Sequence, residues 1–228
     1  MNHLLAALPE TVRNRWAPLS DRVEMQAGVV LCEPGSTVDS VYFPISAIVA
    51  LMYGTRDGEL AEVAIVGNEG VVGISSFMGG GSTPSRAVVQ CPGQFIRIPA
   101  RVVKAEFDES AETRYLLLRY AQALMSQIEQ IAVCNRFHSV DQQLCRWLLV
   151  NMDSIQASEL AVTQDLMADM LGVRRESVCE TEQNLQKAGL ISRSRGRVRV
   201  LDRAGLEHRA CECYRVVKKE YERLLGAH

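Results

Sequence analysis

The chain has 228 residues, of which 47% are hydrophobic and 23% are charged, and its formal net charge is −2. This balance excludes a disordered chain, which would combine low hydrophobicity with a high net charge, and the length allows one or two domains. Because apolar runs stay below the ~20 residues of a membrane span and the first residues lack the basic segment of a secretion signal, we expect a cytoplasmic protein with no membrane partner.

Short apolar runs separated by turn residues fill the chain from about residue 19 to residue 99. Closely spaced strands of this kind predict an antiparallel sandwich or barrel rather than alternating strands and helices. A β-roll of this length can enclose a small-ligand cavity. The predicted strands are 29–32, 40–43, 48–52, 62–66, 86–90 and 94–98, and a glycine-rich stretch at 73–84 interrupts them.

Helix-forming residues replace Gly and Pro from about residue 101 onward. Apolar residues follow one another there at intervals of four and three, which is the seam of a two-helix coiled coil. We therefore predict a long central helix that forms a homodimer through Leu117, Ala121, Leu124, Ile128 and Ile131. The alternative is a single amphipathic helix packed on its own β domain, which two heptads do not exclude. A second helix is predicted at 140–152, followed by a connection at 153–158.

The next segment has the signals of two short helices joined by a tight turn. Thr163 is a suitable N-cap for a helix at 164–171, and Gly172 stands where a left-handed C-cap is required. A second helix follows at 173–187, and the strip 192–201 resembles a hairpin. Helix, turn, helix and hairpin in this order predict a winged helix-turn-helix.

The second of these helices opens with Arg174, Arg175, Glu176 and Ser177. In this motif the N-terminal end of the second helix enters the major groove, where Arg bonds guanine and Glu accepts from cytosine. In the following strip every second residue is an arginine, namely Arg193, Arg195, Arg197 and Arg199. On one strand this spacing predicts a single cationic face. The alternative is a charged edge strand that prevents aggregation, which is less favoured beside a helix-turn-helix.

Seven cysteines are scattered along the chain, at Cys32, Cys91, Cys134, Cys145, Cys179, Cys211 and Cys213. No pair has the Cys-x-x-Cys spacing of a zinc site, and Cys211 and Cys213 have no second pair, so we predict no metal site. Most of the cysteines are interpreted as small buried hydrophobic residues. A redox pair of Cys134 and Cys145 is the alternative, and inert burial is favoured over it.

The stretches 170–178 and 185–191 resemble the recognition element of the Crp–Fnr family of transcription regulators, and 136–149 resembles the hinge and following helix of one subgroup. The resemblance implies an α+β fold with an antiparallel β-roll of the double-stranded β-helix (jelly-roll) type at 1–107. A central dimerisation helix at 108–136 and a winged helix-turn-helix DNA-binding domain at 137–228 would follow.

By that resemblance Arg175 and Glu176 read bases and Thr163 helps to anchor phosphates. Glu180 stands where the catabolite activator of the family has a second base-reading arginine, so the half-site should differ from the one that activator binds. The full predicted DNA-binding set is Thr163, Gln164, Arg174, Arg175, Glu176, Ser177, Arg193, Arg195 and Arg197.

The sensor half departs from the family's cyclic-nucleotide cassette. The cassette has Gly-Glu for the ribose and a later Arg for the cyclic phosphate; here Ile74 follows Gly73, and only the Arg86–Ala87 half is retained. A cyclic nucleotide is therefore doubtful, and the spacing of cysteines and histidines indicates neither an iron–sulfur cluster nor haem. The cofactor stays unknown, and the predicted effector-facing residues are Gly73, Ser75, Arg86, Ala87 and Ile128.

The sequence thus favours a homodimeric regulator that binds double-stranded DNA at a pseudo-palindromic operator and senses an unidentified small effector. RNA polymerase is a further expected partner. The runner-up is a ligand-independent regulator whose β-roll is only a scaffold. A β-roll metal enzyme would need histidine ligands on strands; since none of the four histidines lies in the β-rich region, we predict no enzyme.

Overall fold

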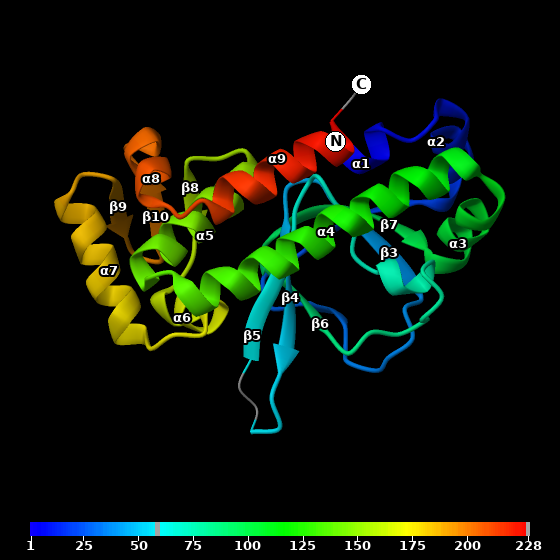
Figure 1. The fold of residues 1–228 in the computed structure, drawn as a ribbon. Coiled ribbons are helices and arrows are strands. Elements are labelled where there is room, and N and C mark those ends of the chain that lie inside the picture. Colours follow the sequence, from blue (N-terminus) through cyan, green and yellow to red (C-terminus); the bar gives the residue numbers. More distant parts are fainter. Residues whose placement is uncertain (58–59, 227–228) are drawn as a thin grey trace.

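The computed structural model describes residues 1–57 and 60–226. An N-terminal β domain and a C-terminal helical domain lie along one long helix (Figure 1). The chain begins with α1 (His3–Ala6), α2 (Glu10–Trp16) and the 3-10 turn η1 (Ala17–Leu19). The strands of the β domain are β1 (Asp21–Met25), β2 (Val30–Cys32), β3 (Ser40–Pro44), β4 (Ile48–Gly54), β5 (Leu60–Val66), β6 (Arg86–Cys91) and β7 (Gly93–Pro99), with the 3-10 turn η2 (Ile74–Ser76) between β5 and β6.

Two antiparallel sheets form the β domain, with strand orders β1-β7-β3 and β2-β6-β4-β5. Phe95 of β7 shares a buried cluster with Val49 and Val89 of the other sheet. Val41, Phe43 and Ile98 are buried in a second cluster that includes Trp16 of α2. The predicted antiparallel β-roll is confirmed, and each predicted strand has a counterpart. Strand β1 was not predicted, because it is a charged edge strand in which Val23 and Met25 are only half-buried.

Helices α3 (Ala100–Glu109) and α4 (Ala111–Phe137) follow the roll. Ser110 caps α4 by accepting a hydrogen bond from the Thr113 amide at 3.2 Å. The helix ends at His138, and Ser139 forms a capping box with Gln142 at the start of α5 (Val140–Ile155). The long central helix is therefore confirmed, and residues 138–139, here called the hinge, separate two capped helices.

The predicted dimer seam on α4 is not the free face of the helix. Leu117, Ala121, Leu124 and Ile131 are buried inside their own chain, and of the predicted seam only Ile128 is exposed, at 37%. Leu117 and Leu124 belong to the core of the roll, which is the alternative that the sequence left open. The exposed stripe lies one residue further along, with Leu118 at 44% and Met125 at 56% exposure.

The C-terminal domain is a winged helix-turn-helix, as predicted. Thr163 caps α6, Gly172 ends it in the left-handed region at φ 63°, and the small sheet has the order β8-β10-β9. Strand β8 and the last two helices were not predicted. The elements are β8 (Glu159–Ala161), α6 (Gln164–Leu171), α7 (Arg175–Lys187), β9 (Ile191–Ser194), β10 (Arg197–Val200), α8 (Arg203–Arg209) and α9 (Cys213–Leu225).

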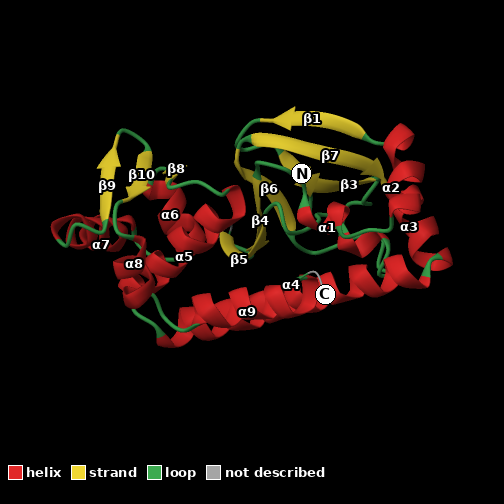
Figure 2. Ribbon diagram, turned by 90° about the horizontal axis from the view of Figure 1, so that it is seen from above, coloured by secondary structure: helices red, strands yellow, loops and turns green. Residues whose placement is uncertain are grey.

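The two domains share one apolar core. Ile48 on β4 and Ile65 on β5 belong to the same buried cluster as Trp147 on α5, and the Gln90 amide donates to Asn151 Oδ1 at 3.1 Å. Helix α9 runs back beside α4 toward the roll (Figure 2), where Tyr221 packs on the core of the roll. Within the described residues, no helix combines the length and apolarity needed to cross a membrane.

Candidate DNA interface and effector site

The N-terminal end of α7 projects into solvent. Arg174 is its N-cap, and Arg174, Arg175 and Glu176 are exposed, while Val178 and Leu185 hold the opposite face in the core. Arg175 Nε lies 3.2 Å from Asp165 Oδ1, with both side chains more than half exposed. Such a surface ion pair contributes little to stability, so breaking it costs little free energy.

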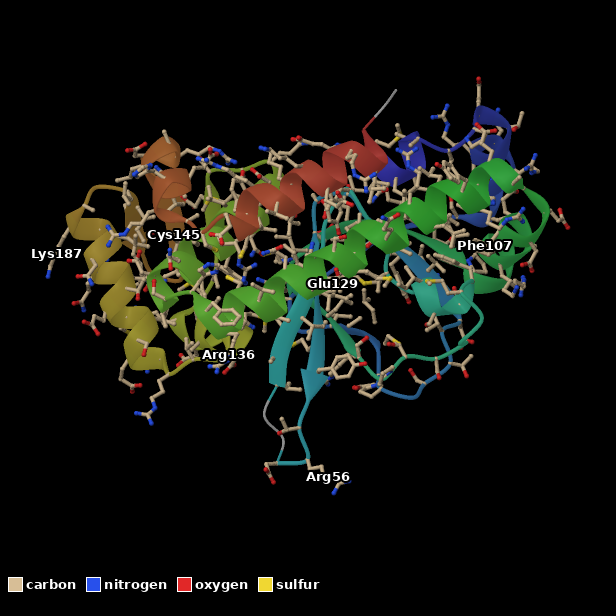
Figure 3. The ribbon with its side chains drawn as sticks, in the orientation of Figure 1. Arg56, Phe107, Glu129, Arg136, Cys145 and Lys187 are labelled. Atoms are coloured by element: carbon tan, nitrogen blue, oxygen red, sulfur yellow. The ribbon has the colours of Figure 1, made fainter. Side chains whose placement is uncertain are left out.

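The exposed face of α7 continues beyond its first turn. Glu180 and Gln183 follow Glu176 at i+4 and i+7 and are exposed, and Lys187 points outward from the far end of the helix (Figure 3). Gln183 was not among the predicted residues, although a glutamine side chain can bond adenine in the major groove. The i, i+4, i+7 spacing from Glu176 is the signal that would have found it.

Three predicted residues near this end have partly structural roles. Thr163 is exposed but its hydroxyl accepts a hydrogen bond from the Leu166 amide at 3.1 Å. The side-chain amide of Gln164 forms its hydrogen bonds within the domain. It donates to Glu182 Oε2 at 2.6 Å and accepts from the Cys179 thiol at 2.9 Å. Ser177 is half-buried. Of these three, only Thr163 has an exposed side chain.

The predicted row of four arginines on one face of the wing is wrong. The chain reverses between Ser194 and Arg197, and in the resulting register Arg193 lies opposite Val198. Directly paired residues share a face, so Arg193 points inward with the buried Val198. Its guanidinium, 18% exposed, pairs with the buried carboxylate of Glu182. On a single strand the four arginines would share one face, but the turn within 192–201 places Arg193 on the opposite face from Arg197 and Arg199.

The remaining wing arginines lie on the outer face. Arg197 and Arg199 flank Glu159 of β8, at 2.9 and 2.6 Å, and both hydrogen bonds lower the pKa of the Glu159 carboxyl. Arg195, at the tip, is exposed and has no hydrogen bond or ion pair within residues 1–57 and 60–226. Among the three outer wing arginines of the described chain, Arg195 is thus the one without a protein partner, and Arg197 is 61% exposed.

The predicted effector residues in the roll fall into two groups. Gly73 adopts φ 101° before η2, and an added Cβ would lie 3.0 Å from Val38 Cγ1. Ser75 Oγ and Arg86 Nε are buried without a hydrogen-bond partner within the described residues, while Arg86 Nη2 pairs with Glu33 Oε1 at 3.1 Å. By contrast, Ala87 is buried in a hydrophobic cluster of the roll, and its contact with an effector stays a prediction.

A cavity of about 600 Å³ lies where the roll, α4, α5 and α9 meet. Burial raises the pKa of Glu69 on its wall, and the Tyr214 hydroxyl donates to Asp153 Oδ2 at 2.7 Å. The sequence did not predict this cavity, because its walls come from segments that are far apart in the chain. The lining includes Gln127, Val150, Met152, Arg203, Lys218 and Tyr221.

Two protein-family models match the chain. The model of the cyclic nucleotide-binding domain matches residues 22–110, and the model of the Crp-like helix-turn-helix domain matches residues 142–209. The first match covers the roll and α3, and the second covers most of α5, the helix-turn-helix and the wing. None of the curated proteins matches the sequence.

Several solved structures have a similar fold. FixK2 from Bradyrhizobium japonicum has a TM-score of 0.71 at 14% identity, covering 84% of this chain and 98% of its own. A CRP-family transcriptional regulator from Thermus thermophilus has a TM-score of 0.70 at 19% identity, covering 82% and 96%. The c-di-GMP responsive global regulator CLP from Xanthomonas campestris has a TM-score of 0.68 at 16% identity, covering 85% and 100%.

Proposed function

Because the chain belongs to the Crp/Fnr family of DNA-binding transcription regulators, we propose that it acts in the cytoplasm as a homodimer on a pseudo-palindromic operator. The observation that carries this proposal is the free N-terminal end of α7, where Arg174, Arg175 and Glu176 are all exposed. A helix presented in this way fits the major groove. Family members are transcription regulators, and we propose no catalytic activity.

Base reading is assigned to the outer face of α7. Arg175 would bond a guanine and Glu176 a cytosine, with Gln183 two turns along the same face. Thr163, Arg195 and Arg197 would meet phosphates, which fix the position of the helix without reading sequence. Arg193 and Gln164 belong instead to the interior of the domain.

Dimerisation is assigned to the exposed stripe of α4. Leu118, Met125 and Ala132 recur every seven residues, Ile128 lies beside them, and all four are exposed. A heptad spacing suits a left-handed pair of helices. Two copies joined along this stripe would present two α7 helices to half-sites ~34 Å apart.

The test is a selection of binding sites from random DNA with the purified full chain. We expect an inverted repeat with half-sites one helical turn apart, retarded in a gel at nanomolar protein. Recovery of a single, non-repeated site would contradict the dimeric arrangement. Failure to enrich any sequence would contradict specific binding.

For the sensor we propose a small anionic effector at Arg86 and Ser75. Each of these residues keeps a buried polar atom without a partner within the described part of the chain, and such atoms normally have one. Ile74 offers no acceptor for a ribose hydroxyl, which argues against a cyclic nucleotide. Operator affinity measured with a panel of anionic metabolites tests this; if no compound changes it, the roll is a scaffold and the regulator is ligand-independent.

A further inference from the structure

Three cysteines and a histidine converge beside the hinge between α4 and α5. Cys134 lies in the last turn of α4, and His138 is the residue that ends this helix. Cys211 lies between α8 and α9, and Cys213 is the first residue of α9. Their three sulfur atoms and one imidazole nitrogen all lie within 4.8 Å of one another. The DNA interface and the effector site make no use of this cluster.

We propose that Cys134, His138, Cys211 and Cys213 bind one Zn²⁺ ion. Cys134 Sγ and Cys211 Sγ are 3.5 Å apart, and Cys213 Sγ is 3.4 Å from His138 Nδ1. With metal–ligand distances of ~2.3 Å to sulfur and ~2.05 Å to nitrogen, a tetrahedral zinc site has ligand–ligand edges of about 3.5–3.8 Å. The cluster therefore has the size of a single ion in a Cys₃His site.

The surroundings orient the ligands toward a common centre. While His138 Nδ1 faces Cys213, its Nε2 lies 3.4 Å from Glu212 Oε1. A carboxylate on the second nitrogen fixes the ring and raises its basicity, as is usual for zinc-binding histidines. Gln130 Nε2 lies 3.2 Å from Cys213 Sγ and donates to it, which a thiolate accepts more strongly than a thiol.

The electrostatics also favour metal-binding thiolates. Cys213 stands at the N-terminus of the 13-residue helix α9, where the helix dipole stabilises negative charge. The positive charge of Arg146 acts on the Cys134 sulfur. Three thiolates and Zn²⁺ leave one net negative charge, and the buried Arg146 can balance it.

Other uses of these residues fit less well. A disulfide between Cys134 and Cys211 would need an S–S distance of ~2.05 Å, whereas the two sulfurs are 3.5 Å apart. An iron–sulfur cluster distributes its cysteine ligands over several iron atoms, which needs more room than ligand atoms within 4.8 Å provide. A single ion would cross-link the end of α4, the hinge and the start of α9.

The test measures metal in the full chain purified without chelators. By mass spectrometry of the metals we expect about one zinc per chain, as for other closed four-ligand sites. Cys134→Ser and Cys213→Ser should lose it. Cys145→Ser is the matched control, because Cys145 is equally buried nearby on α5 but lies outside the cluster, and this variant should keep the ion.

A second measurement tests the site in the wild-type protein, so that it does not depend on whether the cysteine variants fold. Metal-free wild-type protein titrated with Co²⁺ should show the visible bands of tetrahedral cobalt and sulfur-to-cobalt charge transfer. His138→Cys should keep both signals, and Glu212→Gln should weaken zinc binding ~10–100-fold.

Three results would overturn the proposal: wild-type protein that takes up neither metal, uptake unchanged in Cys134→Ser, or a Cys134–Cys211 disulfide found after thiols are blocked at lysis. None of these measurements depends on DNA, so the zinc site and the proposed operator binding can fail separately.

Discussion

Arg175 and Arg193 have different structural roles because their side chains have different neighbours. Both were predicted to contact DNA from their place in the motif. Arg175 is 58% exposed and pairs with a carboxylate that is itself exposed, whereas Arg193 neutralises Glu182, which is 1% exposed. Sequence spacing could place Arg175 at the start of a helix, but it could not show that a turn at 195–196 directs Arg193 inward.

The first prediction concerns Arg175. Replacement by Ala removes the proposed bidentate donor to guanine, so affinity for the selected operator should fall by ~1–3 kcal/mol and one base position should become degenerate. Fluorescence anisotropy and a repeated site selection would measure this, with the melting temperature as the control for folding. Unchanged preference at every position would remove Arg175 from the reading residues.

The second prediction separates the two kinds of wing arginine. Arg195→Ala should weaken binding to all DNA sequences alike and reduce the salt slope by ~1, with wild-type stability. Arg193→Ala should instead leave the buried Glu182 carboxylate unpaired and cost ~3–5 kcal/mol of unfolding free energy. Urea denaturation and salt-dependent binding of both variants check this; a stable Arg193→Ala protein with a reduced slope would reverse the assignment.

At the scale of elements, the sequence predicted best where one local signal decides the outcome. The Thr163 cap and the Gly172 stop determine α6, and the turn residues separate the predicted strands of the roll. Helix α4 was harder, because it carries two neighbouring apolar stripes. Periodicity shows that both stripes avoid water, but it does not show that Leu124 faces the roll while Met125 faces outward.

The third prediction contrasts these adjacent residues. Met125→Lys puts a charge in the middle of the exposed stripe, so light scattering should show a monomer with a wild-type melting temperature. Leu124→Asp buries a carboxylate in the core of the roll, and such a change destabilises the fold strongly. If Met125→Lys stays dimeric, the interface lies elsewhere on the molecule.

At the scale of the whole molecule, the contacts that join the two domains could not be predicted from any local sequence pattern. Helix α9 returns along α4 (Figure 1) and ends against the roll, while sheet residues and α5 share one core. These contacts pair segments far apart in the chain, so neither the cavity nor the cysteine–histidine cluster could be predicted from spacing. The only available signal for the cluster was Cys134 and His138 at i, i+4, with the Cys-x-Cys pair much later.

Glu62 is an ionisable group buried beside this shared core. It is 4% exposed on β5, and the indole N–H of Trp147 on α5 donates to Glu62 Oε2 at 3.5 Å. Burial raises the pKa of the Glu62 carboxyl to about 8, although the charge of Arg146 and the Trp147 hydrogen bond act in the opposite direction. The contact between the roll and the DNA-binding domain therefore contains a protonated acid at neutral pH.

The fourth prediction follows from this raised pKa. Between about pH 4.5 and about pH 8 the folded chain holds a proton on Glu62 that the unfolded chain releases, so stability is full below this window and falls as the pH rises through it. Glu62→Gln cannot ionise. Between pH 5.5 and pH 8.5 the unfolding free energy of the wild type should therefore fall by roughly 3 kcal/mol more than that of Glu62→Gln, at 1.36 kcal/mol per pKa unit. Urea denaturation of both proteins at the two pH values measures the difference. Parallel pH profiles would show that Glu62 is ionised in the folded state, with Arg146 rather than burial setting its charge.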